Sequence, residues 1–308
     1  MTRYVIRRIL LAIPVLIGAS FLIFLLVYGL PGDPIAALVG DQHVTPQVVA
    51  GLRDRYNLDD PFLVQYGKYV WGLLHGDLGL SIQGQRPISD IIGEALPVTI
   101  KLTVIAVLFE IVFGILAGVL SALKKGSFLD NLVLVSTTFL VSIPVFVLGF
   151  VAQYVFAYKL DMFPIAGTEH GLYSYLLPGI ILASLSMSYV ARLTRSSVIE
   201  SMNADYIRTA RAKGLSRSRI VVRHGLRNSL IPVVTFIGAD IGALLGGAIV
   251  TERIYSLPGL GSEVFDGIYH QDGPTVVGIV TLMVFFYIFF NLIVDILYAV
   301  LDPRIRYA

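Results

Sequence analysis

The sequence predicts an all-α integral membrane protein with six transmembrane helices and both termini in the cytoplasm. Of its 308 residues, 56% are hydrophobic and 14% charged, with a mean hydropathy of +0.79, whereas about a quarter of a soluble domain is charged. Six apolar stretches are long enough to cross a bilayer, which takes about 20 helical residues. Lysine and arginine also gather in alternate loops, which is typical of a chain that crosses the membrane repeatedly.

The six predicted spans are long, unbroken apolar runs, which fit helices rather than the alternating strands of a membrane barrel. Their ranges are 9–30, 98–123, 131–158, 173–191, 229–250 and 274–301. The first span follows Arg3, Arg7 and Arg8, as a signal peptide would. Its apolar run of about 22 residues exceeds the roughly 7–15 of a signal peptide, so we expect it to be retained as a span.

The distribution of basic residues predicts the orientation. The two termini and loops 124–130 and 192–228 together carry 16 lysines and arginines, whereas loops 31–97, 159–172 and 251–273 carry 6. Positively charged loops remain in the cytoplasm, so both termini are predicted to be cytoplasmic.

The predicted outer segment 31–97 is too long for a simple turn, and we expect short helices in it. Thr45 can cap a helix that starts at Pro46, and a second helix can start after Pro61. The second helix would carry an apolar, aromatic stripe: Phe62, Tyr66, Tyr69 and Leu73. We interpret the segment as a small packed cap and favour this over a dedicated ligand site.

Loop 192–228 is the largest predicted cytoplasmic piece, and nine basic residues face only two acidic ones in it. Its pattern predicts two helices separated by Gly214, which would occupy the left-handed position that follows a helix. Ser216 can then cap the second helix. The first helix would carry a stripe at helical spacing: Ile199, Met202, Tyr206 and Ala210.

Three interpretations compete for this loop. Its charge could only determine topology and contact lipid phosphates. The helix–glycine–helix order could instead be a DNA-binding helix-turn-helix. Such modules need a third helix to form a core, whereas both ends of this 37-residue loop are tethered to spans, so we expect no nucleic-acid binding. The third interpretation, a rigid lever that docks on a cytoplasmic protein, fits best.

At these residues the chain resembles the permease subunits of binding-protein-dependent ABC importers, in the dipeptide/oligopeptide branch. Their cytoplasmic loop nominally reads E-A-A-x-x-x-G, and the matching positions are Arg208, Thr209, Ala210 and Gly214, of which the first two depart from the motif. The form "RTARAKGLS…RHGLRNSLIP" is similar to the variant of the peptide branch. Further resemblance lies in "YGLPGDPI", "GDLGLSI", "LPVTIKLT", "YSLPGLGSEVF" and "LDPRIRY", which cover essentially the whole chain.

The resemblance implies a type I ABC importer permease fold, with residues 1–308 as one transmembrane permease domain in the bacterial inner membrane. It implies that 31–97 is an extracytoplasmic loop and 192–228 the loop that couples to ATPases. The implied partners are a second related permease in a heterodimer, two ABC ATPase subunits and an extracytoplasmic substrate-binding protein. ATP and Mg²⁺ would bind to the ATPases, since this chain lacks the G-x-x-x-x-G-K-[ST] motif and would be non-catalytic.

The candidate site residues fall into two groups. The expected ATPase-coupling residues are Asp205, Tyr206, Arg208, Thr209, Ala210, Lys213, Gly214 and Leu215. Asp240 and Glu110 are candidates for the translocation pathway, because charges inside a span are rare and usually face the bundle or a cavity. A charge that is simply paired within the bundle is the alternative. No metal site is expected, because the chain has no cysteine and its five histidines are scattered.

The expected function is ATP-driven import of di- or oligopeptides by alternating access. The same machinery could instead carry nickel, glutathione or another small solute. A stand-alone transporter or channel is less consistent with the sequence, because the six spans show no internal repeat. A membrane enzyme is also disfavoured, because no paired carboxylates or Ser/His set recur at usable spacing. Co-purification of an ATPase would separate the importer from these classes.

Overall fold

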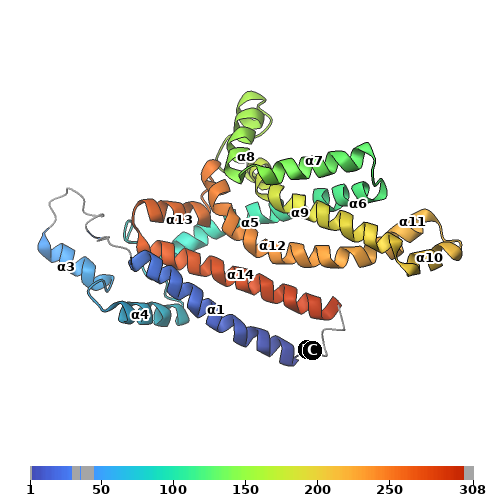
Figure 1. The fold of residues 1–308 in the computed structure, drawn as a ribbon. Helices are drawn as coiled ribbons and strands as arrows, with labels where there is room; N and C mark the ends of the chain where they lie inside the picture. Colours follow the sequence, from blue (N-terminus) through green and yellow to red (C-terminus); the bar gives the residue numbers. More distant parts are fainter. Residues whose placement is uncertain (1, 30–34, 36–44, 302–308) are drawn as a thin grey trace.

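The computed structural model describes residues 2–29, 35 and 45–301. Over these residues the chain is helical, and the only β-type pairing is one isolated antiparallel bridge between Leu80 and Pro87. The helices form an elongated bundle, with α3 and α4 towards one end and α10 and α11 at the other (Figure 1). This confirms the predicted all-α class.

Five long helical segments run along the bundle. They are α1 (Thr2–Tyr28), α5 (Ile88–Phe109) continued by η1 (Glu110–Gly114) and α6 (Ile115–Leu123), α9 (Leu176–Asn203), α12 (Arg227–Ile254) and α14 (Gly273–Leu301). The shorter elements are α3 (Pro46–Arg55), α4 (Phe62–Leu74), α7 (Phe128–Ser142), α8 (Val145–Ala152), η2 (Gln153–Lys159), η3 (Gly171–Tyr175), α10 (Asp205–Ala212), α11 (Arg217–Arg219), η4 (Ile220–Leu226) and α13 (Leu260–Tyr269).

The described helices contain five segments that are long and apolar enough to cross a membrane: Ile6–Tyr28, Ile88–Leu123, Gly171–Asn203, Arg217–Gly246 and Gly273–Val294. A sixth crossing is formed if the bent pair Phe128–Ser142 and Val145–Lys159 counts as one span. Each segment overlaps a predicted span, so the prediction of six spans agrees with the structure.

The third predicted span, 131–158, is not a continuous helix as expected. It bends by 104° between α7 and α8, and α8 projects from the bundle (Figure 1). Pro144 causes the break, because proline has no N–H to donate and forces the preceding residue into an extended conformation. Ile143 accordingly has φ −103° and ψ 128°.

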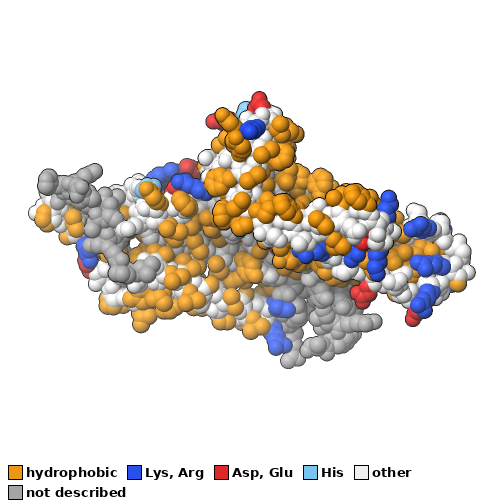
Figure 2. Space-filling model, turned by 45° about the horizontal axis from the view of Figure 1, so that its top comes forward, with side chains coloured by type: hydrophobic (Ala, Val, Ile, Leu, Met, Phe, Trp, Pro, Cys, Tyr) orange, Lys and Arg blue, Asp and Glu red, His pale blue; other side chains and the backbone are white. Residues whose placement is uncertain are grey.

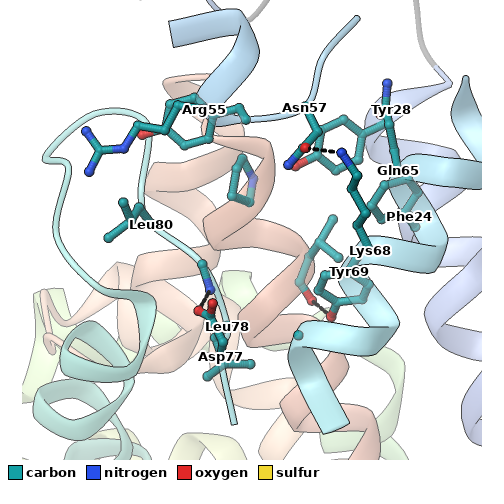
Figure 3. Close-up of a pocket in the computed structure, with 15 residues that line it drawn as sticks. Phe24, Tyr28, Arg55, Asn57, Gln65, Lys68, Tyr69, Asp77, Leu78 and Leu80 are labelled. Atoms are coloured by element: carbon teal, nitrogen blue, oxygen red, sulfur yellow. Dashed lines mark hydrogen bonds between the residues drawn. The ribbon is translucent and has the colours of Figure 1, made fainter. Parts of the chain in front are cut away.

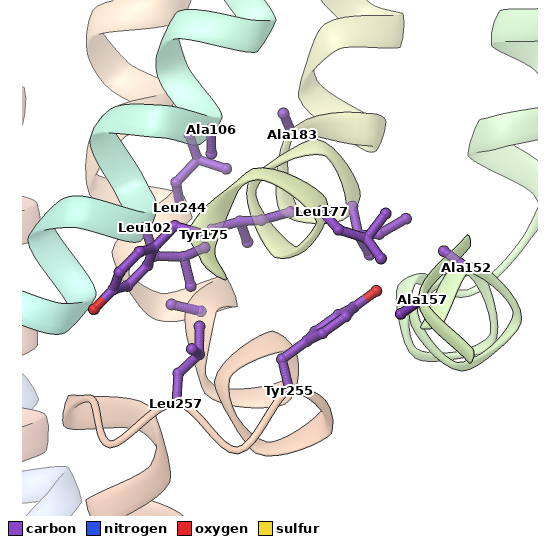
Figure 4. Packing of buried hydrophobic residues seen from close by; sticks show 13 residues of the cluster. Leu102, Ala106, Ala152, Ala157, Tyr175, Leu177, Ala183, Leu244, Tyr255 and Leu257 are labelled. Atoms are coloured by element: carbon purple, nitrogen blue, oxygen red, sulfur yellow. The ribbon is translucent and has the colours of Figure 1, made fainter. Parts of the chain in front are cut away.

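A buried apolar cluster anchors the projecting segment to the bundle. Its members come from α5, α8, η2, η3, α9, α12 and the turn that follows α12. Figure 4 shows Ala152 and Ala157 facing Tyr255 and Leu177. The Tyr255 hydroxyl donates a hydrogen bond to the carbonyl oxygen of Gly149 at 3.1 Å. The bend is therefore a packed feature of the fold, since its polar groups find partners inside the protein.

Helix α9 lies in the middle of the bundle, and the helix formed by η1 and α6 packs directly against it through two glycines four residues apart, Gly114 of η1 and Gly118 of α6. A Cβ atom at Gly118 would come within 2.5 Å of the carbonyl oxygen of Ala191 and of the Thr194 side chain. One at Gly114 would lie 2.8 Å from Val190. Small residues at this spacing allow helices in a membrane to approach closely.

On the face shown in Figure 2, hydrophobic side chains cover most of the bundle between its ends, and charged groups gather at the α10 end and at the tip of the projecting segment. Large hydrophobic side chains remain exposed on several helices, among them Leu10 at 60%, Leu116 at 55% and Phe150 at 56%. An apolar surface of this extent would be unfavourable in water, whereas lipid solvates it. The exposed belt therefore supports a membrane environment for these helices.

Candidate coupling helix and buried carboxylates

The loop between α9 and α12 forms a short exposed helix that ends in a glycine turn. Gly214 has φ +74°, its N–H donates to the carbonyl of Arg211 at 3.0 Å, and the Leu215 N–H donates to that of Ala210 at 3.3 Å. These two bonds form a Schellman motif, which favours glycine because a left-handed conformation strains other residues. The predicted position of Gly214 is confirmed.

The expected apolar stripe through the first helix is wrong, because the helix is interrupted. Ala204 is extended, with ψ 153°, and separates α9 from α10. The break changes the phase of the following residues, so that Ile207 is fully buried while Tyr206 is 41% exposed. The resulting buried cluster is Ile207, Ala210 and Ile220, with Met202 and Leu215 packed against it.

The second predicted helix is not a separate element. Arg217–Arg219 begins a helix that continues through η4 into α12, so this loop leads directly into the next span. Ser216 occupies the N-cap position, but its side chain makes no capping hydrogen bond. The candidate lever is therefore α10 with its glycine turn, which is connected at one end to α9 and at the other, through α11 and η4, to α12.

The candidate coupling residues divide into an exposed face and an inner face. Asp205, Tyr206, Arg208, Thr209, Lys213 and Gly214 are exposed. Ala210 is only 5% exposed and packs against the chain's own cluster, with Leu215 beside it. An ion pair between Arg208 and Asp205 at 3.4 Å lies in the open and contributes little. Surface contacts can therefore come from the exposed set, while Ala210 and Leu215 hold the helix in place.

The two candidate pathway residues are brought together from different helices. Glu110, at the start of η1, is fully buried, and neither of its carboxylate oxygens has a hydrogen-bond partner. Asp240 of α12 is close enough to interact with it electrostatically, and its Oδ2 is also buried and unpartnered. A π-helical turn such as η1 is frequent at functional sites. The sequence identified both residues as rare ionisable side chains inside predicted spans, but only the fold places them near each other.

A pocket that the sequence did not predict lies where α1, α4 and α14 meet residues 55–57 and 77–80. It has a volume of about 300 Å³ and is lined in part by Phe24, Tyr28, Arg55, Lys68, Tyr69 and Asp77 (Figure 3). Lys68 donates to Asn57 and pairs with Asp60, both at 2.6 Å, while Asp77 accepts from the Gly79 N–H at 2.8 Å.

Several polar groups of this pocket therefore already bind partners within the protein. The Tyr69 hydroxyl donates to Thr281 at 2.9 Å, and burial raises the pKa of Tyr69 to about 12 although the Thr281 hydrogen bond opposes the shift. Tyr69 thus stays protonated and ties α4 to α14. This arrangement favours a packed cap over a ligand site. No group of metal-binding side chains occurs in the described part of the chain.

These features define a class: a polytopic helical membrane protein with a short exposed helix between two of its spans. The chain belongs to the family described as binding-protein-dependent transport system inner membrane component, whose model matches residues 110–307, and the N-terminal model of the same system matches residues 1–103. The resemblance found in the sequence is thereby confirmed. The chain has the type I importer permease fold and is a non-catalytic membrane component, because ATPase activity belongs to partner subunits.

Relatives match over the full length of this chain. The dipeptide transport system permease protein DppB of Alkalihalophilus pseudofirmus is 39% identical over 334 residues, covering 100% of both chains. The protein of the same name in Escherichia coli (strain K12) is 36% identical, covering 100% of this chain and 99% of the relative. The glutathione transport system permease protein GsiC of Salmonella paratyphi A is 38% identical, covering 100% of both. The chain is therefore a transmembrane permease subunit of an ABC importer.

Proposed function

We propose that this chain translocates di- or oligopeptides across the bacterial inner membrane as one of two permease subunits in an ATP-driven importer. The observation that carries this proposal is similarity to dipeptide permeases along the whole of this chain, at 36–39% identity. The second permease is a related chain in a heterodimer, two ABC ATPases bind ATP and Mg²⁺, and an external binding protein delivers the cargo.

The proposed orientation places α10 and both termini in the cytoplasm. The excess of lysine and arginine in the termini and in loops 124–130 and 192–228 supports it, because basic loops are retained on that side. The turn between α6 and α7 lies at the same end of the bundle as α10 (Figure 1). Both exposed loops then face the ATPases, whereas α3 and α4 face outward.

The exposed face of α10 is the proposed docking surface. Tyr206, Arg208 and Thr209 would enter a groove on the ATPase, with Lys213 and Gly214 at its edge. When ATP closes the ATPase pair, α10 is displaced, and α9 and α12 carry this displacement into the membrane. The two orientations of the pathway are then two states whose populations depend on ATP and cargo.

Glu110 and Asp240 are the proposed polar residues of the pathway. They lie well inside their spans, and burial of a charge in the membrane is costly unless it serves a site or is compensated. Glu110 is enclosed within the bundle in this conformation. Contact between cargo and Glu110 would therefore occur in another conformation of the transport cycle. Asp240 is only partly buried, so cargo would reach it before Glu110.

Glutathione is the second candidate cargo, supported by the 38% identity to a glutathione permease. To test both, the chain is co-expressed with its neighbouring permease, ATPases and binding protein and reconstituted in vesicles. ATP-dependent uptake of labelled dipeptides is the expected result. Uptake of glutathione or nickel without dipeptides would overturn the peptide assignment. Purification without any ATPase chain would overturn the proposed assembly.

A further inference from the structure

A buried carboxylate joins three helices at the α10 end of the bundle. Asp130, at the start of α7, has a side chain that is only 2% exposed. Arg195 of α9 binds it with two parallel hydrogen bonds, from Nε to Oδ1 at 2.6 Å and from Nη2 to Oδ2 at 2.8 Å. The Ser121 hydroxyl of α6 donates to Oδ1, and the Gly126 N–H donates to Oδ2 at 2.8 Å. One carboxylate thus accepts four hydrogen bonds.

This pair differs from the other ion pairs of the described residues. In Arg86–Glu94, the side chains are 51% and 70% exposed, and such surface pairs contribute little. A buried pair with bidentate geometry is rigid and specific, and losing one partner leaves an uncompensated charge. Asp130 and Arg195 therefore fix the position of α7 relative to α9.

A second contact makes the same connection deeper in the membrane. The close packing of Gly114 and Gly118 against Val190, Ala191 and Thr194 leaves no room for α6 to slide along α9. Asp130 then holds the turn that follows α6. Two independent contacts, one apolar and one ionic, thus bind the α6–α7 hairpin to α9.

The clamp lies close to the docking helix along the chain. Arg195 precedes Asn203, the last residue of α9, by eight residues, which is about 12 Å of helix at 1.5 Å per residue, and α10 begins two residues later at Asp205. A displacement of α10 by a partner reaches the bundle at two points, through this end of α9 and through η4 into α12. Because Arg195 binds Asp130, its side chain is placed to transfer a displacement of α9 to the α6–α7 hairpin.

We propose that Asp130 and Arg195 are positioning residues that make α6, α7 and α9 one rigid unit, through which movement of α10 reaches the α6–α7 hairpin. This inference rests on the proposed function, because it assumes that an ATPase moves α10. Without the clamp, α9 moves while the hairpin lags behind, so ATP is hydrolysed without an equivalent change in the pathway. A residue with only a structural role would lower stability without changing the transport obtained per ATP.

The first test measures rigidity in the assembled transporter. The chain has no cysteine, so the exposed positions Lys125 and Glu200 can be changed to Lys125→Cys and Glu200→Cys and spin-labelled as a pair. We expect the same label distance without nucleotide and with trapped ATP. A change of more than about 5 Å, one helical turn, between these states would overturn the rigid unit.

The second test measures coupling. Arg195→Gln should lower cargo uptake per ATP hydrolysed by about ten-fold, a typical size for energetic coupling between sites. It should also make the distance between the spin labels at positions 125 and 200 differ between the nucleotide-free and the ATP-trapped state. Arg195→Lys keeps the charge but not the two parallel bonds, and should fall between Arg195→Gln and the unmodified protein. The matched control is Arg86→Gln, which removes the exposed ion pair with Glu94 and should leave the cargo uptake per ATP hydrolysed unchanged.

The outcomes separate this inference from the proposed function. Unchanged uptake per ATP in Arg195→Gln, with ATPases bound, would overturn the clamp while leaving the importer intact. Absence of bound ATPases in the unmodified preparation would instead contradict the importer assembly. If Arg195→Gln does not assemble, two measurements still test the clamp. They are the distance between the spin labels in protein that keeps Arg195, and the cargo uptake per ATP hydrolysed in Arg195→Lys.

Discussion

The carboxylate of Glu252 and the hydroxyl of Thr99 lie 2.6 Å apart in the protein interior and join α12 to α5. The other carboxylate oxygen accepts the N–H groups of Gly261 at 2.7 Å and Ser262 at 3.1 Å, in the first turn of α13. The Thr99 hydroxyl in turn accepts the Leu260 N–H at 2.8 Å. A helix N-terminus has free N–H groups and a positive dipole end, so this carboxylate caps α13 from another helix.

Replacing Glu252 by alanine should destabilise the protein. Two buried N–H groups and a buried hydroxyl would lose their acceptor, and each unsatisfied group costs about 1–3 kcal/mol. The measurement is the melting temperature of the purified complex in detergent. Glu94→Ala, which removes an exposed carboxylate of α5, should stay within about 0.5 kcal/mol of the unmodified protein. Equal melting temperatures for the two variants would argue against the cap.

The same contact makes Gly261 sensitive to the smallest enlargement. A Cβ atom there would lie 2.3 Å from the Cα of Ile249, so Gly261→Ala should cost at least the roughly 1–3 kcal/mol of an overpacked core. Gly67 of α4 has open space around it, and Gly67→Ala should raise stability by about 0.5–1 kcal/mol through helix propensity. Thermal unfolding of both variants gives the comparison. The prediction fails if Gly261→Ala is as stable as Gly67→Ala.

Substitution at Gly214 should separate transport from membrane insertion. Gly214→Val introduces a β-branched residue at φ +74°, a conformation that valine rarely adopts, so the turn after α10 should deform and uptake should be lost. Gly214→Asn should retain most of the uptake, because asparagine tolerates this conformation. Membrane fractionation should show equal amounts of both variants. Full, ATP-dependent uptake by Gly214→Val would refute a coupling role for this turn.

Asp240 should affect cargo movement rather than assembly. Asp240→Ala removes a partly buried carboxylate that interacts with Glu110, so we expect slower uptake while the ATPases still co-purify. Glu110→Gln should leave stability unchanged or higher, because it replaces a fully buried carboxyl group that has no hydrogen-bond partner by a group that cannot ionise. Uptake assays with dipeptide and glutathione test both variants. If Asp240→Ala leaves uptake of every cargo unchanged, Asp240 does not belong to the pathway.

Several elements could be read directly from residue patterns. Apolar runs of about 20 residues located the spans, because a helix must satisfy its backbone within one segment to cross lipid. The left-handed turn at Gly214 followed from glycine alone, because the preference is a property of one residue. The helix after Pro61 also matches the structure, where α4 begins at Phe62.

Local patterns misled where the chain leaves a regular helix. The stripe that included Tyr206 assumed one continuous phase, whereas the break at Ala204 turned Ile207 inward instead. Residues 131–158 were predicted as one transmembrane span, whereas the structure bends this stretch at Pro144. Apolar composition satisfies a lipid environment whether a helix is straight or bent, so hydropathy alone could not decide between them.

The sequence by itself determined the class of protein, the approximate spans, the basic loop and the glycine turn, because these depend on composition and on conformational preferences of single residues. Only the tertiary structure decided which polar groups bind each other: Glu252 binds Thr99, and Asp130 binds Arg195, 65 residues apart in the chain. In a membrane, such pairs are determined by which helices pack together, and close packing depends on complementary surfaces that no single segment contains.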